Sequence, residues 1–373
     1  MPFPGWIIWG GAFSERNNSW PYFKLYTDYR ARLSALFQQG DQFADIALLA
    51  PLSDMWAELG AQNEPFPTNV VPEYQPLVWE SIHQNGNGCD YVSERIIRDS
   101  SIENGFLHYG PRKYHTLILI EVERIIPEAV QKLHEFVSKG GKVLCIGRFP
   151  ARYPGWEDHE RKDKEVQDWV EKMKQFPDRF IQLDVPAGNF CEWYQGIQKK
   201  YNLTPYAQIS SPEPYISQVR YQMVDGDLLF FNNSSNRYNY ILEAEISEEI
   251  TSGKQAWIWD AVSGEKFKLQ LTKNRLTLPL GRSDSAIIVF NKDTDGEYYD
   301  PVPFDGGAAS KKIDIPWNVQ FQHYDGRIEF DEFEKLQDLK DIPKYTHFAG
   351  TVKYKNSFFV DDVNGFHHLN LGQ

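Results

Sequence analysis

The sequence predicts an α/β domain followed by all-β domains, and two changes of pattern carry this prediction. Residues 116–120 are apolar throughout, residues 127–139 repeat apolar side chains at helical spacing, and residues 142–146 are apolar again. A strand, a helix and a second strand in this order form a βαβ crossover, which requires a parallel sheet. After Tyr201 the apolar period changes to two, and short strands alternate with turn dipeptides of the Asp-Gly type. We therefore expect a parallel α/β layer first and a β-sandwich after it.

Residues 19–40 predict an amphipathic helix ahead of the α/β domain. The apolar positions at helical spacing are Tyr22, Tyr26, Tyr29, Leu33, Leu36 and Phe37. Ser19 stands at the expected N-cap, Pro21 in the first turn and Gly40 beyond the last turn. We expect a helix over residues 21–39 that docks on the α/β domain through its apolar face.

The α/β domain is expected to span residues 41–200. Apolar runs at 45–50 and 76–82 precede the βαβ unit, and two later helices carry apolar faces around Val166 and Tyr194. We expect these helices to complete or flank the same layer.

The β-sandwich is expected to span residues 201–304. Its expected strands cover residues 219–224, 227–231, 256–259, 267–271, 276–280 and 286–290. Residues 305–310 are rich in Gly and Ala and predict a linker.

Residues 311–373 predict a last, incomplete all-β domain. Strands are expected around 317–321 and 351–354, and a segment of this length is too short to close a sandwich. Open strand edges leave backbone groups unpaired, so we expect this segment to be the least stable part of the chain. The aromatic side chains expected to be partly exposed are Trp317, Phe321, Phe358 and Phe359.

Composition narrows the classes of function. The net charge of −13 opposes binding to phosphate backbones, which excludes a nucleic-acid partner. The longest apolar runs fall far below the ~20 residues of a membrane helix, so no membrane partner is expected. The N-terminus also lacks the basic region and the length of a secretory signal. Aromatic residues make up 15% of the chain, and their flat faces suit sugar rings and β-sandwich cores alike.

Motifs for other chemistries are missing from the sequence. It contains neither of the glycine-rich phosphate loops nor a GxSxG nucleophile elbow. His367 and His368 are neighbours on an expected strand and point to opposite faces, so we expect no metal there, and the acidic residues 329–334 are expected to be solvated. Cys89, Cys145 and Cys191 form no CxxC pair and are expected to be inert core thiols.

Five stretches, in the same order along the chain, resemble one family. They are residues 9–20 (WGGAFSERNNSW), 91–94 (YVSE), 114–119 (YHTLIL), 348–354 (FAGTVKY) and 369–372 (LNLG). The first stretch is similar to the exit of the catalytic barrel in glycoside hydrolase family 106, a family of large bacterial α-L-rhamnosidases. The next two resemble the α/β domain that follows the barrel there, and the last two resemble a sugar-binding jelly roll shared with β-galactosidase-type enzymes.

The resemblance implies a refined fold class, α/β plus all-β. It implies a short N-terminal barrel remnant with the amphipathic helix at 1–40 and a flavodoxin-like parallel α/β domain at 41–200. It further implies β-sandwich, jelly-roll-like domains: a sandwich at 201–304 and an incomplete galactose-binding-like jelly roll at 311–373.

The resemblance also implies where the reaction belongs. In the family, two acidic residues of an N-terminal barrel carry out inverting hydrolysis with a calcium ion nearby. A barrel needs at least ~200 residues, and few residues precede the first expected helix. The resemblance therefore implies an accessory C-terminal fragment, inactive alone, of a rhamnosidase-type enzyme acting on plant or pectic glycans. Its implied partners are a rhamnose-containing carbohydrate and the missing catalytic barrel. No cofactor is expected in this chain, although the intact family enzyme takes calcium and is usually periplasmic or secreted.

The barrel-like stretch holds the candidate site residues. Glu15 is its one carboxylate and is a weak catalytic candidate, with a solvated Glu-Arg pair as the alternative. The expected sugar-binding residues are Trp9, Phe13, Arg16, Asn17 and Trp20. The alternative is that the aromatic side chains only pack the helix against its neighbour. Two other functions stay open for the chain, a stand-alone carbohydrate-binding protein and a structural or assembly module that binds no glycan.

Overall fold

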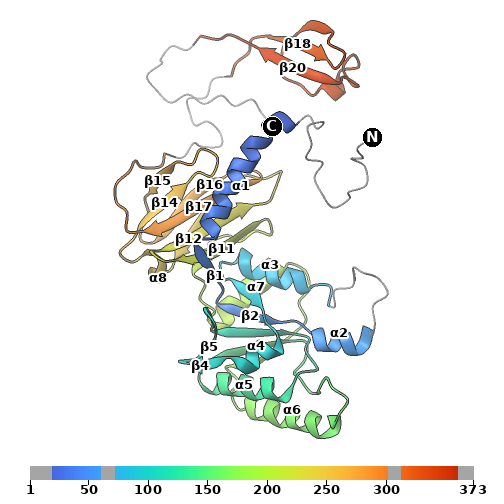
Figure 1. Cartoon of the computed structure of the whole chain (residues 1–373), viewed down its shortest axis with the longest axis vertical. Helices are drawn as coiled ribbons and strands as arrows, with labels where there is room; N and C mark the ends of the chain where they lie inside the picture. Colours follow the sequence, from blue (N-terminus) through green and yellow to red (C-terminus); the bar gives the residue numbers. More distant parts are fainter. Residues whose placement is uncertain (1–18, 60–71, 301–311, 360–373) are drawn as a thin grey trace. The chain divides into compact units, whose positions relative to one another are not determined.

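The computed structural model describes residues 19–59, 72–300 and 312–359. The chain divides into two compact units, Met1–Pro301 and Val302–Gln373. The first unit contains a parallel α/β layer and two antiparallel sheets, and the second contains one small antiparallel sheet (Figure 1). The mixed α/β architecture with a parallel sheet and several further sheets is the one that the sequence predicts.

The α/β layer is built on a five-stranded parallel sheet of order β3-β2-β7-β8-β9. Its strands are β2 (Ile46–Leu49), β3 (Cys89–Tyr91), β7 (Thr116–Ile120), β8 (Lys142–Ile146) and β9 (Phe180–Leu183). The short antiparallel strands β4 (Ser101–Glu103), β5 (Phe106–Tyr109) and β6 (Arg112–Tyr114) form a separate sheet beside it.

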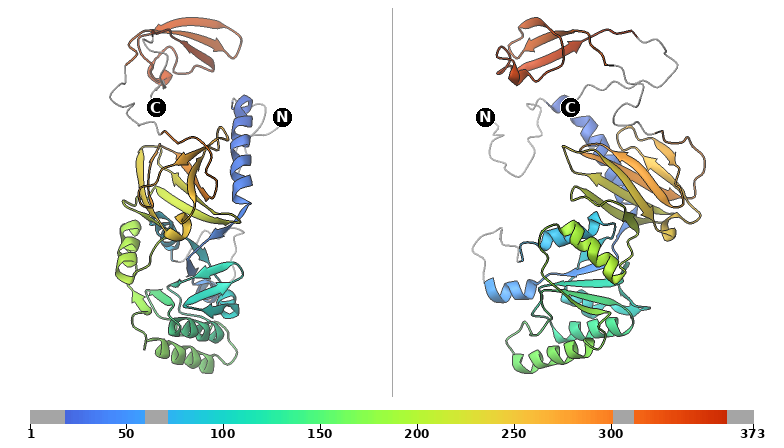
Figure 2. Two further views of the ribbon diagram at one scale, coloured as in Figure 1. Left: turned by 90° about the vertical axis from the view of Figure 1, so that its left-hand side faces the viewer. Right: turned by 180° about the vertical axis from the view of Figure 1, so that it is seen from behind.

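Helices cover both faces of the parallel sheet (Figures 1 and 2). They are α3 (Gln75–Gln84), α4 (Glu94–Asp99), α5 (Pro127–Ser138), α6 (His159–Met173) and α7 (Phe190–Tyr201), and α2 (Leu52–Leu59) lies beyond the carboxyl end of β2. Alternate side chains of β7 point to opposite faces of the sheet. Leu117 and Leu119 pack with α4, α5 and α6, and Ile118 and Ile120 pack with α3 and α7. This alternation explains the uninterrupted apolar run of the strand, because both of its faces are buried.

The predicted βαβ unit is confirmed. β7 and β8 are parallel neighbours, and α5 connects them. The helix begins at Pro127, and its end is closed by the amide of Gly141, which donates to the carbonyl of Phe136 at 2.9 Å. Gly140 has φ of +109°, a conformation that glycine adopts without strain, so this pair of glycines ends the helix.

Two antiparallel sheets follow and share one core. The larger has the order β1-β11-β12-β17-β14-β15, and the smaller has the order β10-β13-β16. The strands are β1 (Gly40–Phe43), β10 (Ala207–Ile209), β11 (Ile216–Met223), β12 (Asp227–Asn233), β13 (Tyr240–Ile246), β14 (Gln255–Trp259), β15 (Lys266–Leu269), β16 (Arg275–Leu280) and β17 (Asp284–Asn291), with the short helix α8 at Glu248–Thr251. Inward side chains of both sheets form the core, among them Leu229, Phe231, Leu242 and Leu278.

The first helix docks on the larger antiparallel sheet, and the expectation that it docks on the α/β domain is wrong. After the turn η1 (Trp20–Tyr22), α1 (Phe23–Phe37) packs Leu36 among residues of β12, β14 and β17 (Figure 2). Phe37 stacks on Tyr221 at 5.0 Å between ring centroids. The helix runs directly into β1, which pairs with β11, and this pairing places α1 beside the sandwich. Residues 41–43, assigned to the α/β domain from the sequence, therefore belong to the sandwich sheet.

The second unit is a three-stranded antiparallel sheet of order β19-β18-β20. Its elements are β18 (Trp317–His323), β19 (Ile328–Phe333), the turn η2 (Leu339–Asp341) and β20 (Gly350–Lys355). Phe321 is fully buried, against the expectation of exposure, because the ring of Tyr345 stacks on it at 3.8 Å. Phe358 and Phe359 are exposed as expected.

Candidate functional site

A buried polar seam joins the α/β layer to the sandwich. The Nδ1 atom of His83 lies 3.0 Å from the carbonyl oxygen of Gln218, and the amide Nε2 of Gln218 donates to the carbonyl of Asn87 at 2.8 Å. These three residues are at most 1% exposed. Because unpaired polar groups are costly inside a protein, this network fixes α3 and its following loop against β11.

The backbone also approaches closely at this seam. Gly86 has φ of +85°, and a Cβ atom there would lie 1.7 Å from the carbonyl oxygen of Ala207 at the start of β10. Only glycine permits this contact between the end of α3 and the smaller sandwich sheet. The seam therefore holds α7, which packs beside α3, in a defined place relative to β10.

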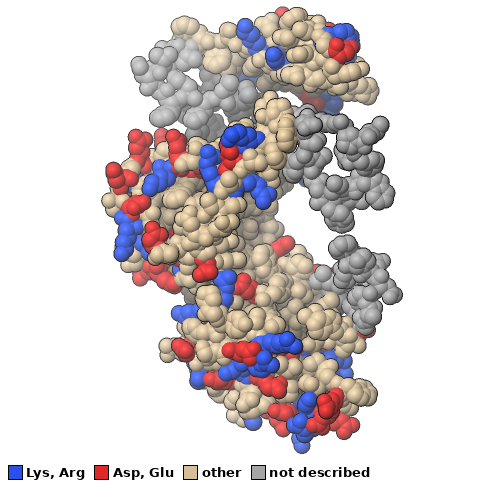
Figure 3. Space-filling model, in the orientation of Figure 1, with Lys and Arg blue, Asp and Glu red and all other residues tan. Residues whose placement is uncertain are grey.

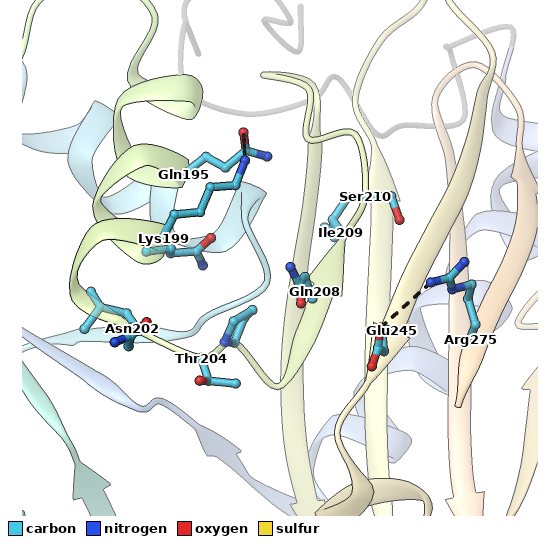
Figure 4. A pocket seen from close by; sticks show the side chains of 12 residues that line it. Gln195, Lys199, Asn202, Thr204, Gln208, Ile209, Ser210, Glu245 and Arg275 are labelled. Carbon is cyan, nitrogen blue, oxygen red and sulfur yellow. Dashed lines mark hydrogen bonds and ion pairs between the residues drawn. The ribbon is translucent and has the colours of Figure 1, made fainter. Parts of the chain in front are cut away.

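A groove of about 340 Å³ lies between α7 and the smaller sandwich sheet, and we call it the α7 groove (Figure 4). Its helix wall presents Gln195, Gln198, Lys199 and Asn202, and its sheet wall presents Gln208, Ser210, Glu245 and Arg275. Leu203, Thr204, Pro205 and Ile209 complete the lining. Nine of the twelve lining residues are polar.

The two cationic side chains of the α7 groove, Lys199 and Arg275, make only weak contacts with neighbouring side chains. The Nζ atom of Lys199 donates to Oε1 of Gln195 at 3.3 Å, and within the described residues no carboxylate lies within 4 Å of it. Arg275 Nη2 lies 4.0 Å from Glu245 Oε2, and both side chains are about 60% exposed (62% and 61%). Exposed ion pairs at this distance contribute little stability, so both cations remain accessible to a ligand.

A smaller hollow of about 80 Å³ lies at the carboxyl ends of β2, β7 and β8. Its acidic lining residues already have partners. Asp54 accepts the backbone amides of Glu123 and Arg124 and lies 3.0 Å from the guanidinium of Arg124, and Glu121 accepts the hydroxyl of Tyr74 at 2.6 Å. These contacts tie α2 and α3 to the sheet.

Glu94 has one property of a general acid but is fully engaged elsewhere. Burial raises its pKa, the direction that a proton donor at neutral pH requires. Its Oε1 accepts the hydroxyl of Ser53 at 2.5 Å and its Oε2 accepts the amide of Ile126 at 2.6 Å. Both oxygens are therefore used to join α2, α4 and the loop before α5.

The candidate residues from the sequence lie almost entirely outside the described residues. This holds for Glu15, Trp9, Phe13, Arg16 and Asn17. Trp20 is described: it is 42% exposed and stacks on Phe23 with 5.2 Å between ring centroids. Its role in binding sugar stays a prediction.

The three cysteines are buried and their thiols are unpaired. Burial raises the pKa of each thiol, to about 11 for Cys191 and well above the usual range for Cys89 and Cys145. The Sγ atom of Cys89 lies 3.5 Å from Nε2 of His83, whose pKa is lowered by burial. Burial thus opposes both charges of a thiolate–imidazolium pair, which agrees with inert thiols.

The described residues hold no cluster of metal-ligating side chains and no helix that could span a membrane. Among residues 19–59, 72–300 and 312–359, no group of three or more His, Cys, Asp or Glu side chains could hold a metal ion. In the same ranges every helix is too short or too polar to cross a bilayer. On the face drawn in Figure 3, acidic and basic side chains are interspersed.

Comparison with known proteins places the chain among glycoside hydrolase-like proteins. The family model of glycoside hydrolase family 106, alpha-L-rhamnosidase, matches residues 2–273. The chain belongs to this family. The rhamnosidase from Novosphingobium sp. PP1Y is similar in structure, with a TM-score of 0.62 and 18% identity over 95% of this chain and 33% of that protein. A protein of Formosa agariphila named "Putative beta-glucuronidase" is 25% identical over 291 residues, which cover 75% of this chain and 22% of that protein.

The chain thus spans a third or less of the length of these two relatives.

The α7 groove is the feature that sequence reasoning missed. One of its walls was visible in the sequence, because Gln195, Gln198, Lys199 and Asn202 follow helical spacing opposite the apolar face of the same helix. The other wall comes from strands that only the fold brings together.

Proposed function

We propose that the chain is an accessory C-terminal part of a bacterial α-L-rhamnosidase-type glycoside hydrolase acting on plant or pectic glycans. The observation that carries this proposal is the structural match: it extends over 95% of the chain and 33% of the Novosphingobium rhamnosidase. The family model supports the same assignment. We further propose that a rhamnose-containing glycan and a catalytic barrel are its partners, and that the chain alone is inactive.

The chemistry of the described residues supports an accessory role. Inverting hydrolysis needs one carboxylic acid that protonates the leaving oxygen and one carboxylate that activates water, about 6.5–9.5 Å apart across a sugar-sized space. Glu94, whose burial favours the protonated form, has both oxygens engaged in structural hydrogen bonds. The α7 groove contains a single carboxylate, Glu245.

We propose finer fold assignments for the parts. Numbered along the chain, the parallel sheet has the order 2-1-3-4-5, which supports a flavodoxin-like domain. The two antiparallel sheets around a shared core support a jelly-roll-like sandwich, and the antiparallel sheet of the second unit is compatible with part of a galactose-binding-like jelly roll.

Affinity electrophoresis tests the proposed engagement of glycan. The purified chain is run in native gels that contain a rhamnose-bearing pectic polysaccharide and in matched gels that contain dextran. We expect retardation in the pectic gel alone. Equal mobility in the two gels would contradict glycan engagement and favour a structural or assembly module.

A further inference from the structure

We propose that the α7 groove binds a short oligosaccharide that carries a carboxylate. This inference rests on the proposed function, because it names the ligand chemistry of one site in an accessory part of a glycan-active protein. The volume of about 340 Å³ lies within the ~300–1,000 Å³ typical of small-molecule sites.

The helix wall of the groove is a row of polar side chains on one face of α7, continued by the residue after the helix. Gln195, Gln198 and Lys199 stand at i, i+3 and i+4, so they are neighbours on the helix surface, and Asn202 follows at the C-cap with a φ of +51°. Gln198 is held in place, since its Nε2 donates to the carbonyl of Asn85 at 3.0 Å and to Oδ1 of Asn87 at 2.6 Å. The buried seam thus fixes part of this wall before any ligand arrives.

The sheet wall is a cross-strand row on the outer face of the smaller sandwich sheet. Gln208 of β10 pairs in register with Glu245 of β13, and Glu245 pairs with Arg275 of β16 (Figure 4). Their chain neighbours point inward to the sandwich core, so the row stands on a packed support. Three strands therefore present one amide, one carboxylate and one guanidinium toward the helix row.

Sugar hydroxyls match the amides of this groove. Each hydroxyl both donates and accepts hydrogen bonds, and each Gln or Asn amide offers both functions in one planar group. The groove has three such amides, those of Gln195, Asn202 and Gln208, whereas Gln198 keeps only its carbonyl oxygen because its Nε2 already donates to Asn85 and Asn87. Of the three apolar lining residues, Leu203 and Ile209 are at most 3% exposed and Pro205 is partly exposed, so the groove offers few apolar side chains to a ligand.

The two cations favour a ligand that carries a carboxylate over a neutral one. Lys199 and Arg275 stand on opposite walls, and Glu245 is the one carboxylate in the lining. The guanidinium of Arg275 is free to bind a ligand carboxylate through two parallel hydrogen bonds, because its pair with Glu245 is exposed and lies at 4.0 Å. A carboxylate bound there would not displace a strong contact.

Calorimetric titration of the full chain tests this site. The probes are α-1,4-linked trigalacturonate and the neutral trimer obtained by reducing its carboxyl groups, each alone and with excess acetate. The variants are Arg275→Gln and the matched control Arg282→Gln, an exposed arginine in the turn after β16 that does not line the groove. We expect trigalacturonate to bind the unaltered chain, and to bind Arg275→Gln at least about tenfold more weakly and Arg282→Gln unchanged. The neutral trimer should bind more weakly than the acidic one, and acetate should not abolish binding.

Three results would overturn the site. The first is that the unaltered chain does not bind trigalacturonate, and the second is that Arg275→Gln and Arg282→Gln bind it with equal affinity. The third is that acetate displaces trigalacturonate fully, which would indicate general anion binding. Electrophoresis of the same proteins separates this failure from failure of the proposed function. If the unaltered chain and Arg275→Gln are retarded equally by pectic polysaccharide, the groove is wrong and glycan engagement stands. If the unaltered chain is not retarded, the proposed glycan engagement fails.

Discussion

Asp227 neutralises a buried arginine, and its replacement should be costly. Its Oδ1 accepts Nε and Nη2 of Arg220 at 2.9 and 2.7 Å, and its Oδ2 accepts Nζ of Lys254 at 2.6 Å. The Arg220 side chain is 1% exposed and lies over the ring of Phe43 at 4.2 Å. The other carboxylate that Arg220 contacts, that of Glu249, is 67% exposed and screened by water. Asp227→Asn therefore leaves a buried charge almost unpaired, and we expect a loss of about 3–5 kcal/mol of unfolding free energy.

The assay is urea unfolding followed by tryptophan fluorescence, because Trp257 and Trp259 lie in the same sheet as Asp227. The matched control is Asp293→Asn, which removes the exposed pair with Lys266 and should cost less than about 1 kcal/mol. Replacing both buried partners, Arg220→Met with Asp227→Leu, should restore part of the stability, since no buried arginine is left unpaired, although Lys254, 18% exposed, still loses its pair with Asp227. A loss in Asp227→Asn no larger than in Asp293→Asn would refute the reasoning.

Three further predictions concern helix packing, pH and thiol reactivity. Leu36→Asp should lower the thermal midpoint of the first unit clearly, because Leu36 is 7% exposed, whereas Leu25→Asp, at a site 70% exposed, should leave it almost unchanged. Burial lowers the pKa of His83 below its unfolded value of 6.5, so its contribution is complete above that pH and is lost as the pH falls. Thermal scans between about pH 7.5 and 5.5 should therefore show a smaller loss for His83→Gln than for the unaltered chain. Iodoacetamide at mild alkaline pH should modify none of the three cysteines in the native chain and all of them in urea, as counted by mass spectrometry.

Local patterns predicted the parts of the fold that local interactions determine. The βαβ unit follows from the apolar run at β7, the face of α5 and the glycines that end this helix. The docking of α1 did not follow, because the helix is placed by the pairing of Gly40 with Met223, far along the chain. A helical period shows that an apolar face exists and leaves its partner undefined.

The same limit applies to the second unit and to the groove. Phe321 is buried because Tyr345 covers it from a connecting segment that has no strand period. The sheet wall of the groove depends on the registers that join Gln208, Glu245 and Arg275, which no local pattern specifies. The candidate site residues before Trp20 lie outside the described residues, so they stay predictions.

The central proposal is that the chain is an accessory part that is inactive alone. An assay of rhamnose release tests it most directly. The purified chain and Glu15→Gln are incubated with an aryl α-L-rhamnoside and with rhamnose-bearing pectic oligosaccharides, and released rhamnose is followed over time against a buffer blank. We expect both proteins to match the blank, because the proposal assigns the acid and the base that inversion requires to the partner barrel. Release of rhamnose by the unaltered chain that disappears in Glu15→Gln would contradict the proposal and make the chain an enzyme in its own right.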